Sequence, residues 1–201
     1  MFERIKQQIS QLTIDDISDE RKLILNELVA YIKQKQSENN VIQLNFICTH
    51  NSRRSHLSQL WAQTMANYFG IKNVYCYSGG TEATAMFYKV AETLVEQGFQ
   101  INKKDETTNP VYEVYYDELA SPILCFSKTF DDPFNPDTNF AAIMTCSSAD
   151  EACPYIPGAT KRIPIRYEDP KAYDNTPEMD AKYRERSLEI AREMKFVFGD
   201  C

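Results

Sequence analysis

Histidine, glycine and proline are scarce in this chain, and each shortage excludes something. The 201 residues include only two histidines, and no two of the six cysteines have Cys-x-x-Cys spacing, so we expect no structural zinc site. The first glycine is Gly70 and the first proline is Pro110, so the opening third lacks helix breakers and favours helices. No run approaches the roughly 20 apolar residues of a membrane-spanning helix.

An excess of positive charge is also missing. Lysine and arginine total 22 against 29 acidic residues, which gives a net charge of −7. Nucleic acid is therefore not an expected partner, because its phosphates require a basic surface. Residues 1–8 are charged and lack the apolar region of a secretory signal. We expect a cytoplasmic protein with no membrane partner, whose hydrophobic content of 43 % suffices for a globular core.

Helix and strand patterns follow one another along most of the chain. Residues 2–12 and 18–36 predict two helices, with Ser18 as the N-cap of the second. Further on, predicted strands at 41–47, 74–77, 141–145 and 163–165 alternate with amphipathic helices, the last of them opening at Thr176. Such alternation favours a parallel sheet with helices on both faces. Residues 111–116 and 123–130 alternate in strand fashion and predict a β-hairpin.

This pattern predicts two parts of the chain. Residues 1–40 form a helical N-terminal extension, and residues 41–201 form an α/β domain with a hairpin inserted at about 111–130. The two parts meet near residue 40, after the polar stretch that ends the second helix.

One polar loop, Cys48 to Ser55, lies between a predicted strand and a predicted helix. Ligands of open α/β sheets bind at the carboxyl ends of strands, and a helix N-terminus there offers free N–H groups and a positive dipole end. A cysteine at that place readily becomes a thiolate. Five residues separate Cys48 from Arg54, which is enough to wrap a tetrahedral oxyanion while the guanidinium donates to two of its oxygens. We call residues 48–55 the oxyanion loop; the alternative interpretation is a buried cysteine before a polar helix start.

The Cys-x5-Arg-Ser pattern resembles that of cysteine-dependent phosphatases, and residues 46–62 look like the active-site loop of two related families. These are the low-molecular-weight protein tyrosine phosphatases and the thioredoxin-coupled arsenate reductases. The sequence Ser78-Gly79-Gly80-Thr81 is similar to the Ser-Ala-Gly-Thr of the family, and Asp169-Pro170 to its Asp-Pro. The resemblance spans residues 43–198 and implies a flavodoxin-like α/β fold, with an open parallel sheet and helices on both faces.

The resemblance also implies roles for individual residues. Cys48 is the expected nucleophile, Arg54 binds the oxyanion, and Asp169 is the general acid of the phosphatases; Asp-Pro is equally a common turn opener. The rest of the oxyanion loop is expected to bind the substrate, namely Thr49, His50, Asn51, Ser52, Arg53 and Ser55. Neither family implies a metal or another cofactor.

Two cysteines, Cys146 and Cys153, are similar in spacing and place to the redox pair of the arsenate reductases, which the phosphatases typically lack. We call residues 146–153 the relay segment. A helix of that length rises about 10.5 Å, whereas a disulfide needs Cα atoms within about 7 Å. We therefore predict an exposed, marginally stable segment that unwinds on oxidation. Without the resemblance, both cysteines are equally well read as packing residues.

Three residues depart from the family pattern or stand outside it. His50 replaces a usual glycine, and either helps to hold Cys48 as a thiolate or faces solvent. Arg53 replaces a cysteine or an apolar residue, and either adds charge for the oxyanion or points to solvent. The pattern of the helix that follows places His56 on the surface.

The leading hypothesis is reduction of arsenate to arsenite through a Cys48 adduct and a Cys146/Cys153 disulfide that thioredoxin regenerates. The alternative is a phosphatase that hydrolyses phosphomonoesters through a Cys48 phosphoenzyme with Asp169 as general acid. A third hypothesis is a non-catalytic anion-binding or thiol-sensing module in which His50 and Arg53 have disabled turnover. The expected partners are a small oxyanion and, for the first hypothesis, thioredoxin.

Overall fold

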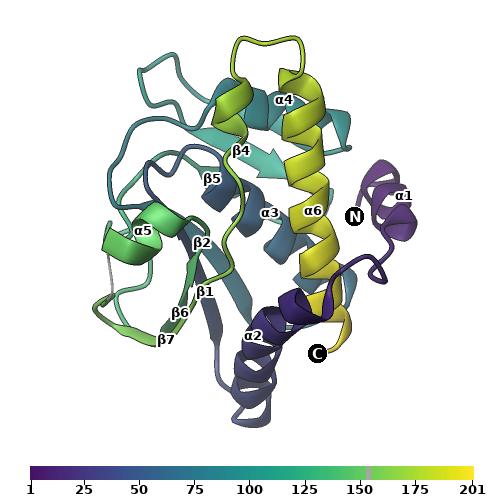
Figure 1. The fold of residues 1–201 in the computed structure, drawn as a ribbon, viewed down its shortest axis with the longest axis vertical. Helices are drawn as coiled ribbons and strands as arrows, with labels where there is room; N and C mark the ends of the chain where they lie inside the picture. Colours follow the sequence, from purple (N-terminus) through teal and green to yellow (C-terminus); the bar gives the residue numbers. More distant parts are fainter. Residues whose placement is uncertain (153–154) are drawn as a thin grey trace.

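Four parallel strands form the central sheet of the computed structural model, which describes residues 1–152 and 155–201. The strands are β1 (Ile42–Cys48), β2 (Val74–Gly80), β6 (Phe140–Met144) and β7 (Ala159–Ile163). They lie in the order β2-β1-β6-β7, as Figure 1 shows. Counted among the parallel strands alone this order is 2-1-3-4, the flavodoxin-like arrangement. The predicted fold class is therefore confirmed.

The two faces of this sheet are covered unequally. Leu44 and Phe46 point into the larger core, which contains side chains of α2 (Asp19–Ser37), α3 (Arg54–Tyr68) and α6 (Met179–Gly199). Ile47, Ala142 and Met144 point into a smaller core with Ala149 of α5 (Ser147–Ala152). Because side chains alternate along a strand, neighbouring residues of β1 serve both cores.

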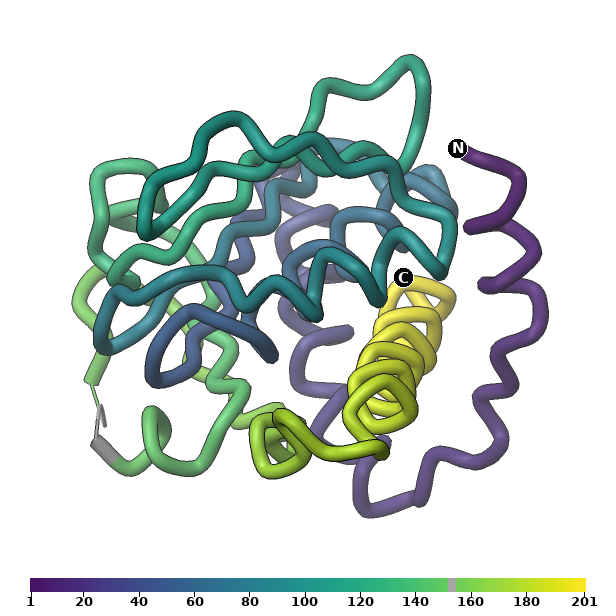
Figure 2. Tube along the Cα trace, turned by 90° about the horizontal axis from the view of Figure 1, so that it is seen from above, coloured from purple at the N-terminus to yellow at the C-terminus, as the bar shows by residue number. Residues whose placement is uncertain are grey.

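The N-terminal helices pack along α6. Ile5 and Ile9 of α1 (Glu3–Gln11) are fully buried in the larger core, and α1 and α2 flank α6 in Figures 1 and 2. Ser18 accepts a hydrogen bond from the Arg21 N–H at 3.2 Å, so the predicted N-cap is confirmed. The Arg21 guanidinium donates to both carboxylate oxygens of Glu193 on α6, at 2.7 and 2.8 Å. The N-terminal helices α1 and α2 therefore share the larger core with the α/β part of the chain.

A second, antiparallel sheet stands beside the first. It consists of β3 (Gln100–Lys103), β4 (Tyr112–Tyr115) and β5 (Ile123–Cys125), and it follows α4 (Tyr88–Glu96). The predicted hairpin is confirmed as the pair β4–β5, but its second strand ends at Cys125 and does not extend to residue 130 as predicted. Sequence reasoning missed β3, whose residues are mostly exposed and polar.

Two predicted boundaries were displaced. The strand expected at 163–165 is β7, which begins at Ala159. The last helix begins at Met179, later than expected, because Thr176 caps an earlier turn: its hydroxyl oxygen accepts from the Glu178 N–H at 3.3 Å.

The outer edge of β2 is paired with side chains of α3 instead of another strand. Gln63 donates to the Val74 carbonyl at 3.1 Å and accepts from the Cys76 N–H at 3.0 Å. Gln59 donates to the Cys76 carbonyl at 3.0 Å. The backbone of this edge is thereby satisfied without a neighbouring strand.

In the part of the chain that the structure describes, every helix is too short or too polar to cross a membrane.

Candidate active site

The oxyanion loop follows β1 and runs directly into α3, as predicted, and its carbonyl groups are bonded away from its centre. The Cys48 carbonyl accepts from the Thr81 N–H at 3.1 Å and the Thr49 carbonyl from the Glu82 N–H at 2.8 Å. Three further donors hold the carbonyls of His50 and Ser52: the hydroxyls of Ser127 and Thr84, and the Phe87 N–H. With its carbonyls fixed outward, the loop leaves its N–H groups for a ligand.

The loop N–H groups have no recorded protein acceptor. From Thr49 to Arg54, no backbone N–H donates to a protein atom among the described residues. The N-cap residue of α3, Arg53, makes no side-chain cap bond either, so the free N–H groups of the helix start add to those of the loop. Asn51 has φ of 45°, a left-handed conformation that lets the chain turn back on itself. This is an arrangement that binds anions.

Gly80 allows the loop to lie directly on the end of β2. A Cβ at this position would stand 2.7 Å from the Thr49 oxygen, 2.7 Å from the Asn51 nitrogen and 2.4 Å from the Glu82 oxygen. No side chain fits there, because all three neighbours are backbone atoms. The Ser-Gly-Gly-Thr sequence is therefore the support on which the oxyanion loop rests.

The sulfur of Cys48 is buried inside the loop. Cys48 is 3 % exposed, and its Sγ lies 3.1 Å from the Ser55 hydroxyl. That hydroxyl also accepts from the Asn51 side-chain amide at 2.8 Å, which leaves its own hydrogen free to donate to the sulfur. A nucleophilic sulfur thus stands where the loop would place an oxyanion.

Arg54 and Asp169 face one another at the mouth of the loop. Arg54 Nη2 donates to Asp169 Oδ2 at 2.5 Å, and Nη1 donates to the Tyr167 carbonyl at 3.1 Å. Its Nε is buried and has no partner among the described residues. Asp169 caps the short 3-10 helix η1 (Pro170–Tyr173) by accepting from the Lys171 N–H. Nε and the second N–H of each Nη therefore have no recorded partner among the described residues, so Arg54 keeps donors for a bound anion.

The structure shows where the two loop residues that differ from the family pattern, His50 and Arg53, direct their side chains. His50 is exposed, with Nε2 3.6 Å from the Glu82 carboxylate, so the outward alternative holds for its side chain. Neither alternative holds for Arg53, whose side chain is largely buried and is bonded to Asp174 and Tyr183. Its backbone stays in the loop, while its charge is already paired.

Cys146 stands next to the oxyanion loop. Strands β1 and β6 are parallel, with Ile47 opposite Met144. The segments that follow these two strands therefore begin side by side. Cys146 Sγ lies 3.5 Å from the Thr49 hydroxyl, and Cys146 shares the smaller core with Cys48. Both cysteines are free thiols in this structure. The relay partner expected at Cys153 lies outside the described residues.

The described part of the relay segment is less exposed than expected. Residues 147–152 form α5, in which Ala149 and Asp150 are buried while Ser147, Ser148 and Glu151 face solvent. Asp150 pairs with Arg162 and Arg166, with Arg166 Nε 2.6 Å from its carboxylate. The sequence pattern could not show this pairing, because its partners lie 12 and 16 residues away.

His56 was wrongly predicted to lie on the surface: it is fully buried beneath the oxyanion loop. Its Nδ1 lies 3.2 Å from the Ser78 hydroxyl. Burial and the nearby Lys128 ammonium lower the pKa of His56 to about 3, so the ring is neutral.

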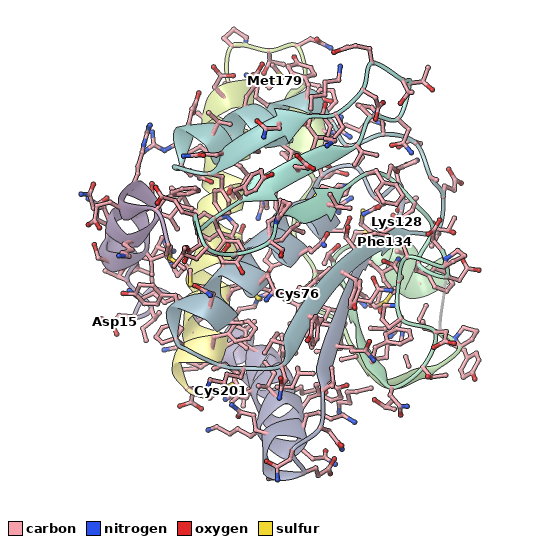
Figure 3. All side chains as sticks on the ribbon, turned by 180° about the vertical axis from the view of Figure 1, so that it is seen from behind. Asp15, Cys76, Lys128, Phe134, Met179 and Cys201 are labelled. Atoms are coloured by element: carbon pink, nitrogen blue, oxygen red, sulfur yellow. The ribbon has the colours of Figure 1, made fainter. Side chains whose placement is uncertain are left out.

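Lys128 is a buried residue that sequence reasoning missed. Its backbone N–H donates to Asn51 Oδ1 at 3.0 Å, and its carbonyl accepts from Gly80 N–H at 2.9 Å. Its Nζ lies 4.5 and 5.2 Å from the ring centres of Phe126 and Phe134, and Figure 3 labels Lys128 beside Phe134. Burial lowers the pKa of Lys128 to about 8. Nothing in the composition of the sequence indicated that Lys128 would be buried.

Comparison with known proteins identifies relatives of both predicted kinds. No protein-family model matches the chain. Two arsenate reductases from strains of Staphylococcus epidermidis are 26 % identical over 127 residues, or 62 % of this chain and 76 % of each relative.

Solved structures agree in fold. The low-molecular-weight protein tyrosine phosphatase of T. tengcongensis has a TM-score of 0.54 at 15 % identity, covering 80 % of this chain and 99 % of that one. A low-molecular-weight phosphotyrosine phosphatase of Vibrio cholerae O395 has a TM-score of 0.53 at 13 % identity, covering 79 % and 95 %.

The curated relatives, the shared fold and the Cys-x5-Arg loop after the first sheet strand agree with one another. In sequence the chain is similar to arsenate reductases, and in fold it is similar to low-molecular-weight protein tyrosine phosphatases.

Proposed function

We propose that this enzyme reduces arsenate to arsenite by a thiol relay that starts at Cys48. The observation that carries the proposal is the location of Cys146, whose sulfur is 3.5 Å from the Thr49 hydroxyl at the rim of the oxyanion loop. A phosphatase needs no second thiol there, whereas a reductase does. The naming of the Staphylococcus relatives as arsenate reductases supports the same choice.

The first step forms a bond between Cys48 and arsenic. Arsenate has the charge and shape of phosphate, so the loop N–H groups and Arg54 bind its oxygens. The Cys48 thiolate attacks arsenic, the S–As bond forms, and one As–O bond breaks. Asp169, held beside Arg54 at 2.5 Å, gives a proton to the departing oxygen, which leaves as water.

The second step reduces arsenic. The Cys146 thiolate attacks the Cys48 sulfur, an S–S bond forms, and the S–As bond breaks with its electron pair left on arsenic. Arsenic(V) becomes arsenic(III), and arsenite departs. One Cys48–Cys146 disulfide now holds the oxidising equivalents.

The third step restores Cys48. Cys153 attacks Cys146, which releases the Cys48 thiol and leaves a Cys146–Cys153 disulfide for thioredoxin to reduce. α5 starts directly after Cys146. Seven residues of helix would rise about 10.5 Å, more than the roughly 7 Å that a disulfide allows between Cα atoms, so we propose that α5 unwinds in this step. A cycle of this kind requires a reducing compartment, which agrees with the expected cytoplasmic location.

A phosphomonoester phosphatase is the second candidate, and the pairing of Arg54 with Asp169 favours it. The same Cys48 would attack phosphorus, Asp169 would protonate the leaving oxygen, and water would hydrolyse the phosphoenzyme. This reaction makes no use of Cys146.

A Cys146→Ser variant separates the two candidates. NADPH consumption is measured with arsenate, thioredoxin and thioredoxin reductase, beside hydrolysis of an aryl phosphate. We expect the variant to lose arsenate turnover by more than about 10³-fold and to keep its hydrolysis rate. Cys76→Ser, which alters an equally buried cysteine on β2, is the matched control, and Cys48→Ser removes both activities.

Full arsenate turnover in Cys146→Ser would refute the relay. Hydrolysis by the native enzyme without arsenate-dependent NADPH consumption would make it a phosphatase. Phosphate binding with neither activity would support the anion-binding module.

A further inference from the structure

Two consecutive arginines of the active site hold the two ends of one short helix. Arg54 pairs with Asp169, the residue that caps the start of η1. Arg53 pairs with Asp174, the residue that ends it, with Nη2 2.6 Å from Asp174 Oδ2. The helix that carries Asp169 is therefore fastened to the oxyanion loop at both ends.

The second fastening is a closed triangle of hydrogen bonds. Arg53 Nε donates to the Tyr183 hydroxyl at 2.5 Å, and that hydroxyl donates to Asp174 Oδ1 at 2.6 Å. Burial and the Asp174 carboxylate raise the pKa of Tyr183, so its proton stays in place to make this bond. The Arg53 guanidinium also lies 4.1 Å from the centre of the Phe87 ring. We call Arg53, Asp174 and Tyr183 the clamp.

Burial distinguishes the clamp from the pair at the other end. The side chains of Arg53 and Asp174 are 12 % and 15 % exposed, whereas Asp169 is 37 % exposed. Charged hydrogen bonds in a desolvated place are stronger and more rigid than those that compete with water. The end of η1 at Asp174 is thus the more firmly held of the two.

The firmer hold on η1 at Asp174 than at Asp169 becomes important when substrate binds. In the proposed function Arg54 donates to the oxyanion, so its bond to Asp169 must weaken when substrate enters. Arg53 has no such duty, because its donors are already occupied by Asp174 and Tyr183. The clamp then keeps its hold on the end of η1 at Asp174, and through η1 it keeps Asp169 in place above the loop.

We propose that Arg53, Asp174 and Tyr183 are positioning residues that hold Asp169 against the leaving oxygen while Arg54 binds the oxyanion. The inference rests on the proposed function, because it requires an oxyanion in the loop and a proton from Asp169. The clamp touches no substrate atom; it acts through η1.

A double-mutant cycle tests the clamp. Single-turnover arsenate reduction is measured for Asp174→Asn, Asp169→Asn and the variant with both substitutions, at saturating arsenate. We expect Asp174→Asn to lower the rate at least tenfold and to change the half-saturating arsenate concentration less than threefold. In the Asp169→Asn background, the same change has no further effect. A general loss of structure would reduce the rate in both backgrounds.

Aryl phosphates give a second readout wherever the enzyme hydrolyses them. Phenyl phosphate needs a proton on its leaving oxygen, and 2,4-dinitrophenyl phosphate does not. The clamp predicts a tenfold loss of kcat/KM in Asp174→Asn for the first ester and less than a threefold loss for the second, because kcat/KM reports the step in which the leaving oxygen departs. Equal losses for both esters, or additive losses in the cycle, would overturn the proposal.

Milder variants keep the test valid if Asp174→Asn fails to fold. Tyr183→Phe removes one hydroxyl and leaves no buried charge unpaired, so we expect a smaller loss of the same kind, about threefold. Arg53→Lys keeps the charge but lacks the planar guanidinium that bonds Asp174 and Tyr183 in fixed directions, and its loss is expected to fall between those of the other two variants. Asp180→Asn breaks a different pair between α6 and α4, with Lys89 at 2.8 Å, and is the matched control.

The outcome separates this proposal from the one on which it rests. A native enzyme that does not reduce arsenate defeats the proposed function, whether or not it hydrolyses aryl phosphates. A native enzyme that reduces arsenate, and whose Asp174→Asn variant retains that activity, defeats the clamp alone.

Discussion

The oxyanion loop follows β1 and the relay segment follows β6, so both lie at the carboxyl ends of the strands. They are nevertheless held in different ways. The loop is bonded at nearly every carbonyl, by residues of segments 81–87 and 127. The described part of the relay segment is a helix of six residues anchored through Asp150. A site that binds charge works best when its dipoles are fixed in advance, whereas a relay must open and close. The difference in anchoring matches these two tasks.

The largest effect is expected where the rigid loop meets its support. In Gly80→Ala the new Cβ would overlap backbone of Thr49, Asn51 and Glu82, so the loop must shift. We expect phosphate affinity to fall more than tenfold and the free energy of unfolding to fall by about 1–3 kcal/mol. Isothermal titration with inorganic phosphate and urea unfolding measure both.

Gly199→Ala is the control for that change, because its Cβ would meet only the ring of Phe69, at 3.2 Å. Unchanged phosphate affinity in Gly80→Ala would show that the loop is not rigid.

A second, smaller effect is expected in the relay segment. Asp150→Asn weakens the pairing with Arg162 and Arg166, and should lower the free energy of unfolding by about 1–2 kcal/mol, since both arginines reach solvent. Hydrogen exchange of the amides of 147–152 should accelerate at least tenfold, while phosphate affinity stays within twofold. The exposed Glu151→Gln on the same helix is the control. If Asp150→Asn lowered phosphate affinity as well as the protection of the 147–152 amides, the oxyanion loop and the relay segment would not be held in different ways.

Oxidation should act on the relay segment in the same direction. If a Cys146–Cys153 disulfide requires α5 to unwind, its amides exchange faster in the arsenate-oxidised enzyme than in the reduced one. The amides of α3 serve as the internal reference. Equal protection of α5 in both forms would contradict the unwinding step.

The smallest effect on activity is expected at Lys128, whose backbone supports the loop while its side chain lies between aromatic rings. The pKa of Lys128 is lowered to about 8, so the folded state loses the proton at a lower pH than the unfolded state does. The native protein therefore gains stability as pH rises from about 8 to about 10.5, relative to Lys128→Met.

At pH 7 the same variant should be more stable than the native protein, by up to about 3 kcal/mol, with arsenate turnover within threefold. Urea unfolding at pH 7 and pH 10 measures the difference between the two proteins. A destabilised Lys128→Met at pH 7 would show that the charge, and not only the backbone, supports the loop.

Local pattern was enough to predict the sheet and the position of the loop. Strand β6 is an uninterrupted apolar run, and β1 is largely apolar although Gln43 and Asn45 lie within it. The loop between β1 and α3 has a strong signature of its own. Strand β3 had no such signal, because its residues are polar and it is held by pairing with β4. Strand β7 was misplaced for a similar reason, since Lys161 and Arg162 interrupt its pattern.

The site was predictable where roles follow from the loop itself, and not where they depend on distant partners. His56 was misplaced because nothing near it in sequence reveals that Ser78 would cover its ring. The role of Arg53 depends on Asp174 and Tyr183, which lie 121 and 130 residues away. Such pairings are set by tertiary packing, which propensity and periodicity do not describe.

The glutamines along β2 have a consequence for assembly. An open sheet edge normally invites a strand from another chain, which leads to strand exchange or to fibres. Here Gln59 and Gln63 occupy the outward backbone groups of Val74 and Cys76, and Asn135 donates to the carbonyl of Ser78. Beyond them, Gly80 is bonded to Lys128 and Phe130. An incoming strand would have to displace these partners one by one. This edge of the sheet is therefore closed to edge-to-edge association, although among the described residues no fifth strand of the sheet covers it.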